Sequence, residues 1–326
     1  MNPLEFPHPE INRDGNHDPA RRRTLRCLAA WSGAAVVWTV TGGVPRALGA
    51  TGGAAPAAQD ARAFTFVQIS DTHIGFHKEA NPDVVGSVRH AIAEINALPN
   101  APAFVIHTGD VSHLSKPDEF AQARDILKEI RVDRVHTVPG EHDAIDDGLT
   151  GYLKFFDHDG KGRAWYSFDQ GGVHFVGLCN VLEFKMGRLA SLGTDQLAWL
   201  KADLASVSRS TPVVVMVHIP MWTIYEQWGW GTADAQEATA LLRPFGSVTI
   251  LNGHIHQVMQ KVEGNIAIYT ARSLAYPLPT PGQEGFGEPG PLKVPAGELG
   301  KRLGTRQFTL VPTKHELAMI DMPLDH

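Results

Sequence analysis

Five short segments of the sequence are rich in side chains that commonly ligate metal ions, and each follows a run of β-type residues. The ligand-type side chains in them are three aspartates, one glutamate and five histidines. Carboxylates and imidazoles without a thiolate suit Mn, Fe, Zn or similar cations. In chain order, the segments are Ser70–His73, Gly109–Asp110, Gly140–Asp143, His218 and Gly253–His256.

The spacing within these segments is also informative. One residue separates Asp71 from His73, and one separates His254 from His256. Because side chains alternate along an extended chain, such a step places both ligands on the same side. A glycine before the ligand of three segments lets the backbone turn sharply where the strand ends. Asp110 stands alone in its segment, and a carboxylate with two oxygens could bridge two ions.

The elements around these segments alternate between strand and helix patterns. Apolar runs predict strands at 64–70, 103–108, 135–138, 213–217, 248–252 and 266–270. Apolar residues at helical spacing predict helices at 82–98, 117–130, 194–207 and 235–242. Paired strands are predicted at 165–168 with 173–178, and at 307–311 with 317–322. The pattern predicts an α/β domain with mixed sheets, and the carboxyl ends of its strands would bring the ligand segments together.

These five segments, in this order, resemble the pattern of the calcineurin-like metallophosphoesterase family, D-x-H, G-D, G-N-H-D/E, H and G-H-x-H. The resemblance covers roughly Phe64 to Tyr276. It implies a four-layer α/β/β/α sandwich of two mixed β-sheets flanked by helices, with a site for two metal ions. Mn, Fe or Zn are the expected metals.

Residue roles follow from the resemblance position by position. One metal would be held by Asp71, His73, Asp110 and His256, and Asp110 would bridge to the second. The second metal would also be held by Glu141, His218 and His254. His142 would face the substrate as a general acid, with Asp143 supporting its ring.

Glu141 is a departure, because the family has Asn at this place. The carboxylate adds a negative charge, which should tighten the second metal and weaken its Lewis acidity. A second oddity is His113, where the purple acid phosphatase branch has a Tyr ligand. Since His73 already supplies the D-x-H ligand, we interpret His113 as a residue of the rim or of the surroundings of the ligands.

The implied activity is hydrolysis of a small phosphomonoester or phosphodiester by a hydroxide that bridges two metals. His142 would protonate the leaving oxygen, and Asp143 would raise its pKa and fix its tautomer. Two other hypotheses stay open. One is a non-catalytic metal-binding or interaction protein on the same fold, which Glu141 leaves possible, and the other is a redox metalloprotein.

The composition limits the function classes. The 326 residues include 29 Lys and Arg against 35 Asp and Glu, a net charge of −6, which does not favour nucleic-acid binding. Two cysteines exclude a disulfide-rich scaffold, and Cys179 is best explained as a buried apolar residue.

The first fifty residues have the plan of an export signal. Arg21-Arg22-Arg23 precedes an uncharged run from Cys27 to Pro45, and small residues follow it. We interpret 1–50 as a twin-arginine-type signal peptide, 51–62 as a flexible linker and 63–326 as the catalytic domain. The signal implies export machinery as a partner and a periplasmic location. A membrane anchor is the alternative, although the run lacks the Leu and Ile density of a spanning helix.

For several aromatic residues, two arginines and one loop, the sequence leaves the role open. Trp222, Tyr225, Trp228 and Trp230 could form an aromatic pocket wall or simply a packed loop. Arg188 and Arg272 could clamp a phosphate, but no spacing favours either. The Pro/Gly-rich segment 277–305 could be an ordered excursion or a mobile flap. His107 is expected to be a hydrogen-bonded core residue.

Overall fold

The structure is a computed structural model that describes residues 37–41, 44–48, 64–145, 148–283, 285–311 and 316–324. The expected linker 51–62 lies outside the described residues, as does the expected signal peptide apart from two short strands. Among the helices in the described ranges, none is both long and apolar enough to cross a membrane.

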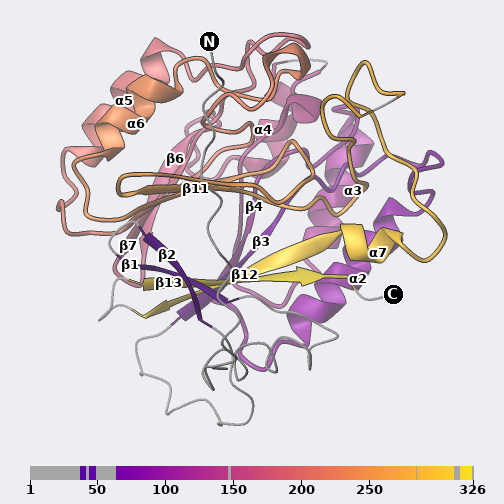
Figure 1. The fold of residues 1–326 in the computed structure, drawn as a ribbon, viewed down its shortest axis with the longest axis horizontal. Coiled ribbons are helices and arrows are strands. Elements are labelled where there is room, and N and C mark those ends of the chain that lie inside the picture. Colours follow the sequence, from indigo (N-terminus) through magenta and orange to yellow (C-terminus); the bar gives the residue numbers. More distant parts are fainter. Residues whose placement is uncertain are drawn as a thin grey trace, which may run out of the picture.

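Within the described residues, thirteen strands form two mixed sheets (Figure 1). The larger sheet has parallel strands at one edge and antiparallel pairing across the rest, whereas the smaller sheet has a parallel centre with an antiparallel strand at each edge. The first sheet runs β2 (Val44–Leu48), β1 (Val37–Thr41), β13 (Glu316–Pro323), β12 (Gly304–Val311), β3 (Phe64–Ile69), β4 (Phe104–His107) and β5 (Val135–Thr137). The second runs β10 (Gln260–Glu263), β11 (Ile266–Thr270), β9 (Val248–Asn252), β8 (Val213–Met216), β7 (Val173–Gly177) and β6 (Tyr166–Gln170).

Helices cover the outer faces of both sheets. In Figure 1, α2 (Val84–Asn96) and α3 (Pro117–Leu127) lie on one side, with α5 (Thr194–Leu204) and α6 (Ala235–Leu242) on the other. Two further helices, α4 (Thr150–Phe156) and α7 (Leu299–Arg302), have no counterpart among the predicted elements. Both are short, so the chain offers too few turns for an apolar stripe to show.

The alternation of side chains along β3 explains the layers. Val67 and Ile69 pack into an apolar cluster with α2 and α3, whereas Phe66 faces the second sheet and packs against Phe175 and Phe308. This two-residue period divides each central strand between two cores. The predicted four-layer α/β/β/α sandwich is therefore confirmed.

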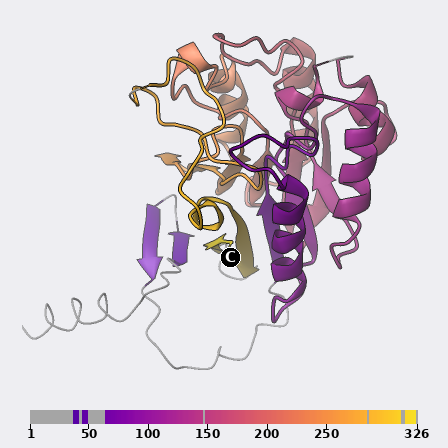
Figure 2. The same cartoon turned by 90° about the vertical axis from the view of Figure 1, so that its right-hand side faces the viewer.

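Two of the strands come from the expected signal peptide: β1 lies within its uncharged run, and β2 begins at the end of that run and includes Arg46. The β1–β2 hairpin is joined to the sheet through pairing of β1 with β13 (Figure 2). Removal of 1–50 would thus leave the pairing of β3, β4 and β5 intact.

The Pro/Gly-rich segment folds back over the second sheet. Leu292 N donates to Pro277 O at 2.9 Å, and Gln257 Nε2 donates to Pro279 O at 3.0 Å. Trp228 Nε1 donates to Gly287 O at 3.0 Å. The described part of 277–305 is therefore fastened at several points, as expected of an ordered excursion.

A buried histidine with two carboxylate partners ties the β6–β7 hairpin to α5. His174, which is 5% exposed, places Nδ1 at 2.8 Å from Asp169 and Nε2 at 2.8 Å from Asp203. Burial lowers the pKa of His174, but the hydrogen bonds to Asp203 and Asp169 outweigh it, so the pKa is raised.

We expect the stabilisation from His174 to depend on pH. Because its pKa is raised on folding, its contribution is complete below the unfolded value of about 6.5 and is lost as pH rises through the folded value. The variant His174→Gln should lose about 1–3 kcal/mol of stability at pH 5.5 and less at pH 9. Thermal unfolding of both proteins at the two pH values measures this, and an equal loss at both would contradict it.

Candidate metal centre and catalytic site

The seven candidate metal ligands meet where the carboxyl ends of strands from both sheets come together. The turns after β3 and β4 lie side by side, since Asp71 N donates to Gly109 O at 3.0 Å and His73 N donates to Asp110 O at 2.9 Å. From the second sheet, His254 N donates to Asp71 Oδ1 at 3.0 Å. Backbone contacts between the turns thus bring segments from distant parts of the chain to one place.

Most of these ligands have an unusual backbone. Five of the seven have a left-handed conformation, with φ between 41° and 69°. Non-glycine residues in this region cost free energy and cluster at functional sites. The five are Asp71, His73, Asp110, His254 and His256.

One group of ligands consists of Asp71, His73 and His256, whose ligand atoms all lie within 4.8 Å of one another. His256 Nε2 is 3.3 Å from Asp71 Oδ1 and 3.3 Å from His73 Nε2. All three side chains are buried.

A second group consists of Glu141, His218 and His254. His218 Nε2 is 2.9 Å from Glu141 Oε2, and His254 Nδ1 is 2.9 Å from Glu141 Oε1. Asp110 lies between the groups, with Oδ2 at 3.5 Å from His73 Nε2 and 3.4 Å from His218 Nε2.

The donor set fits a pair of divalent cations. Several buried ligand atoms have no hydrogen-bond partner among the described residues, although some lie within 3 Å of an oppositely charged group. Such atoms cost about 1–3 kcal/mol each when nothing satisfies them. Buried acids and imidazoles gathered this closely, with part of their hydrogen-bonding capacity unused, are expected around metals. They are Asp71 Oδ2, Glu141 Oε2, His218 Nε2 and both ring nitrogens of His254.

Two ligand histidines are oriented by backbone carbonyls behind them. His218 Nδ1 lies 2.7 Å from Thr108 O, and His256 Nδ1 lies 2.5 Å from Tyr276 O. A carbonyl only accepts, so each Nδ1 carries a proton and each Nε2 faces the other candidate ligands, where it would offer its lone pair to a bound cation.

Glu141 adds charge to the second group, as expected from its carboxylate. Burial raises its pKa, but the charges of His254 and His218 outweigh this, so the pKa lies well below its ordinary value. Conversely, burial lowers the pKa of His218, but Asp110 and Glu141 together raise it well above the ordinary value. The site therefore favours an ionised Glu141.

Comparisons with known proteins agree with this geometry. Residues 64–258 match the family model described as calcineurin-like phosphoesterase. The chain belongs to this family. A probable glycerophosphodiester phosphodiesterase of Arcobacter nitrofigilis is 23% identical over 213 residues, covering 64% of this chain and 77% of that protein.

Purple acid phosphatase 15 of Arabidopsis thaliana is 34% identical over 110 residues, or 31% of this chain. The match spans only 19% of that relative's length. A solved dimetal phosphatase from Danio rerio shares the fold with a TM-score of 0.55 at 16% identity, covering 80% of this chain and 96% of that one.

His142 lies beside the candidate metal ligands, and its ring is held by a different group from the one expected. Its ring Nδ1 lies 2.7 Å from His113 O. Because a carbonyl only accepts, this contact places a proton on Nδ1 and leaves Nε2 outside the contact. Its backbone N donates to Asp110 Oδ1 at 2.9 Å. Burial lowers the pKa of His142, but Asp110 and Glu141 more than compensate, so the pKa is raised.

The charge of Asp143 helps to raise the pKa of His142, as predicted, but the expected contact that fixes the ring is made by His113 O instead. The hydrogen bonds of the Asp143 carboxylate run to the backbone N–H groups of Val111 (3.0 Å), Ser112 (2.7 Å) and Gly140 (2.9 Å). Asp143 thus positions the turns that carry Asp110 and Glu141. Burial and the charge of Asp110 raise its pKa to about 6, although the backbone N–H groups lower it.

His113 lies beside His73 and His142, and these three histidines form a further group whose ligand atoms lie within 4.8 Å of one another. The His113 ring stacks on that of His142 with centroids 5.0 Å apart, and its Nδ1 is 3.4 Å from His73 Nδ1. Burial and the charge of His142 lower the pKa of His113 to about 4. An uncharged His113 avoids repulsion beside His142.

His107 behaves as the predicted hydrogen-bonded core residue. Gly109 N donates to its Nδ1 at 3.2 Å, and its Nε2 lies 2.9 Å from Thr72 Oγ1. Burial lowers the pKa of His107 to about 3. A neutral His107 therefore links the two turns that carry Asp71 and Asp110.

The ligands open into a cavity of about 270 Å³ that Trp228 and Trp230 help to line. Trp222 and Tyr225 are not among its lining residues, so only part of the predicted aromatic wall reaches it. Arg188 and Arg272 are also absent from the lining.

Sequence reasoning missed Tyr276 and the loop residues at Pro289–Pro291, which also line this cavity. Tyr276 stacks on His73 with centroids 4.9 Å apart, and its hydroxyl lies 3.3 Å from His73 Nε2. Its place shortly after β11, a parallel neighbour of β9, is a signal that could have pointed to it.

Two glycines of the family pattern are required by close approach. A Cβ at Gly140 would lie 2.1 Å from Asp110 Oδ1, and one at Gly109 would lie 2.3 Å from His218 Nδ1. Gly109 also has φ +99°, which disfavours other residues. These glycines therefore let the ligands pack against the neighbouring turns.

Proposed function

We propose that this chain is an exported, metal-dependent phosphoesterase that hydrolyses a small phosphomonoester or phosphodiester. The observation that carries the proposal is the two groups of buried or partly buried candidate ligands on either side of Asp110, whose ligand atoms lie within 4.8 Å of one another in each group. Family membership supports the same reaction class.

The candidate ligands fall into two sets, one for each cation. Asp71, His73 and His256 would hold one divalent cation, Glu141, His218 and His254 the other, and Asp110 would contact both. When bound, two such cations would neutralise charge on a phosphoryl group and supply a nucleophile from water at neutral pH.

His142 would deliver the proton that the leaving oxygen needs. The His113 carbonyl takes up Nδ1, so Nε2 is the nitrogen available for proton transfer. Both His142 and His113 line the cavity that the ligands open into, so a substrate phosphoryl group held there would lie beside them. The walls formed by Trp228 and Trp230 would exclude water and contact the leaving group.

Export is proposed from the N-terminal sequence alone. The arginine run at 21–23, the uncharged stretch after it and the small residues near position 50 support a twin-arginine-type signal and a periplasmic location.

A screen of the purified protein tests the reaction. Metal content is measured first, and the protein is then assayed with phosphomonoesters, cyclic nucleotides, phosphodiesters and pyrophosphates. Near two metals per chain and turnover of at least one ester class are expected. Bound metal without turnover on the whole panel would contradict the proposal and favour a non-catalytic metal-binding protein, the alternative that Glu141 suggests.

Glu141→Asn in the same screen isolates the effect of the extra charge. Loss of one carboxylate charge beside His218 and His254 should weaken metal affinity about tenfold, the equivalent of about 1.4 kcal/mol. Turnover at saturating metal should rise, because the second cation becomes a stronger Lewis acid. Metal titration of activity separates these effects, and a fall in turnover at saturating metal would show that the Glu141 carboxylate has another role.

A further inference from the structure

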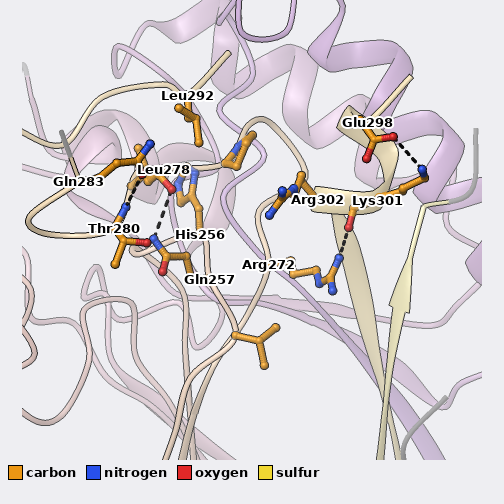
Figure 3. A pocket seen from close by; sticks show the side chains of 12 residues that line it. His256, Gln257, Arg272, Leu278, Thr280, Gln283, Leu292, Glu298, Lys301 and Arg302 are labelled. Carbon is orange, nitrogen blue, oxygen red and sulfur yellow. Dashed lines mark hydrogen bonds and ion pairs between the residues drawn. The ribbon is translucent and has the colours of Figure 1, made fainter. Parts of the chain in front are cut away.

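A second cavity, of about 600 Å³, adjoins the catalytic one (Figure 3). The two share His256 and Leu278, so a metal ligand forms part of the wall between them. The 277–305 segment lines both cavities, through Leu278 and Pro289–Pro291 on the catalytic side and through residues from Pro277 to Arg302 on the other.

The charged side chains in the lining of the second cavity are mostly basic. Arg272, Lys301 and Arg302 line it, and Glu298 is the acidic residue among its lining residues. Glu298 is paired with Lys301 at 2.7 Å, and its charge also interacts with that of Arg302. Three basic side chains therefore share one carboxylate in the lining, in a chain whose net charge is −6.

The guanidinium of Arg272 is held in place. It is half-buried, and its Nη1 donates to the carbonyl of Lys301. The negative charge of Asp321 favours the charged form of Arg272, but the Asp321 carboxylate already accepts a hydrogen bond from the buried Arg306 at 2.6 Å. Burial lowers the pKa of Arg272, and the nearby charges of Arg302 and Arg306 lower it further. An anion beside Arg272 and Arg302 would offset this repulsion, and two planar guanidiniums match phosphate oxygens well.

The other end of the cavity is neutral and polar. Gln257, Thr280 and Gln283 line it, and their side-chain and backbone groups are linked to the 277–305 segment. Figure 3 shows these residues on the His256 side and the arginines on the opposite side. A phosphate at the basic end would leave room for an uncharged polar body at this end.

We propose that this cavity is a second phosphate-binding site, next to the metal centre. Its ligand is either free phosphate or a distal phosphate of the substrate, and the latter reading rests on the proposed phosphoesterase function.

Phosphate titration of the metal-loaded protein by calorimetry tests the site without any need for turnover. The wild-type chain should bind two phosphates, one at the metals and one in the second cavity. Arg302→Gln should weaken the second by about tenfold or more, as expected from loss of a charge-assisted contact. Arg272→Gln should weaken binding in the second cavity to a similar extent. Asp110→Asn should instead abolish binding of the phosphate at the metals. The matched control Arg243→Gln, at an exposed arginine paired with Glu263, should bind two.

Kinetics then identify the source of the phosphate. Phenyl phosphate is compared with a phenyl diphosphate ester that carries a second, distal phosphate group. A rise in the ratio of the two KM values in Arg302→Gln, against an unchanged ratio in Arg243→Gln, assigns the site to the substrate. If Arg302→Gln loses the phosphate in the second cavity but keeps the wild-type ratio of KM values, the site is assigned to free phosphate. If Arg302→Gln and Arg272→Gln both keep wild-type phosphate binding and KM ratio, the proposal is overturned. Because the titration needs no activity, failure of the proposed function would leave this test intact.

Discussion

Asp110→Asn is expected to lower kcat/KM by about 10³-fold or more. The substitution keeps the shape of the side chain and an acceptor oxygen for His142 N, which donates to Asp110 Oδ1. It removes the charge of the carboxylate whose Oδ2 lies within 3.5 Å of a histidine from each ligand group. Both cations would lose a shared ligand.

The fold should survive this change. In the metal-free protein, removal of the Asp110 charge relieves repulsion with Asp71 and Glu141 but also loses attraction to His218, so the melting temperature should change little. In the metal-loaded wild type, binding at 100 times Kd stabilises by about 2.7 kcal/mol, and chelation should remove this gain.

The two measurements together decide the role of Asp110. The variant should show little difference in melting temperature between metal-loaded and chelated samples, whereas Asp133→Asn, at an exposed loop position, should behave as the wild type. An active Asp110→Asn protein that keeps its metal-dependent stabilisation would refute a role for Asp110 as the shared ligand.

His142→Gln should lower kcat by about 10²–10⁴-fold for an ester with a poor leaving group, such as an alkyl phosphate. The loss should be far smaller for nitrophenyl phosphate, whose leaving oxygen needs little protonation. The glutamine amide can still donate to His113 O but cannot act as an acid near neutral pH.

The dependence on the leaving group separates proton delivery from positioning. Metal content should be unchanged, and His90→Gln, which alters a histidine paired with Glu94 on α2, serves as the control. Equal losses for both esters would indicate that His142 only orients the site, and no loss for either would exclude it from the reaction.

Much of this protein could be predicted from local sequence. Alternating and helical periodicities located the central strands and long helices, because burial of one face imposes them over a few residues. The ligand types and their positions after strands predicted a metal centre, since strand ends of an α/β sheet meet at one edge. Short or exposed elements such as α4, α7 and β10 carried too little pattern to be found.

Contacts between segments distant in the chain could only come from the tertiary structure. The sequence suggested that Asp143, adjacent to His142, would hold the His142 ring. In the structure the carbonyl of His113 holds that ring, and the Asp143 carboxylate accepts hydrogen bonds from the backbone of the neighbouring turns. Likewise, Tyr276 reaches His73 across some two hundred residues of chain.

The sequence by itself determined which groups could bind metal and on which kind of element they lie, because those properties depend on residue type and local period. The tertiary structure alone decided which hydrogen-bond partner sets each histidine tautomer. It also decided that Arg272 and Arg302 line a separate basic cavity next to the catalytic one. Both depend on how the 277–305 segment and the turns from two sheets pack together, and nothing in the spacing along the chain specifies that packing.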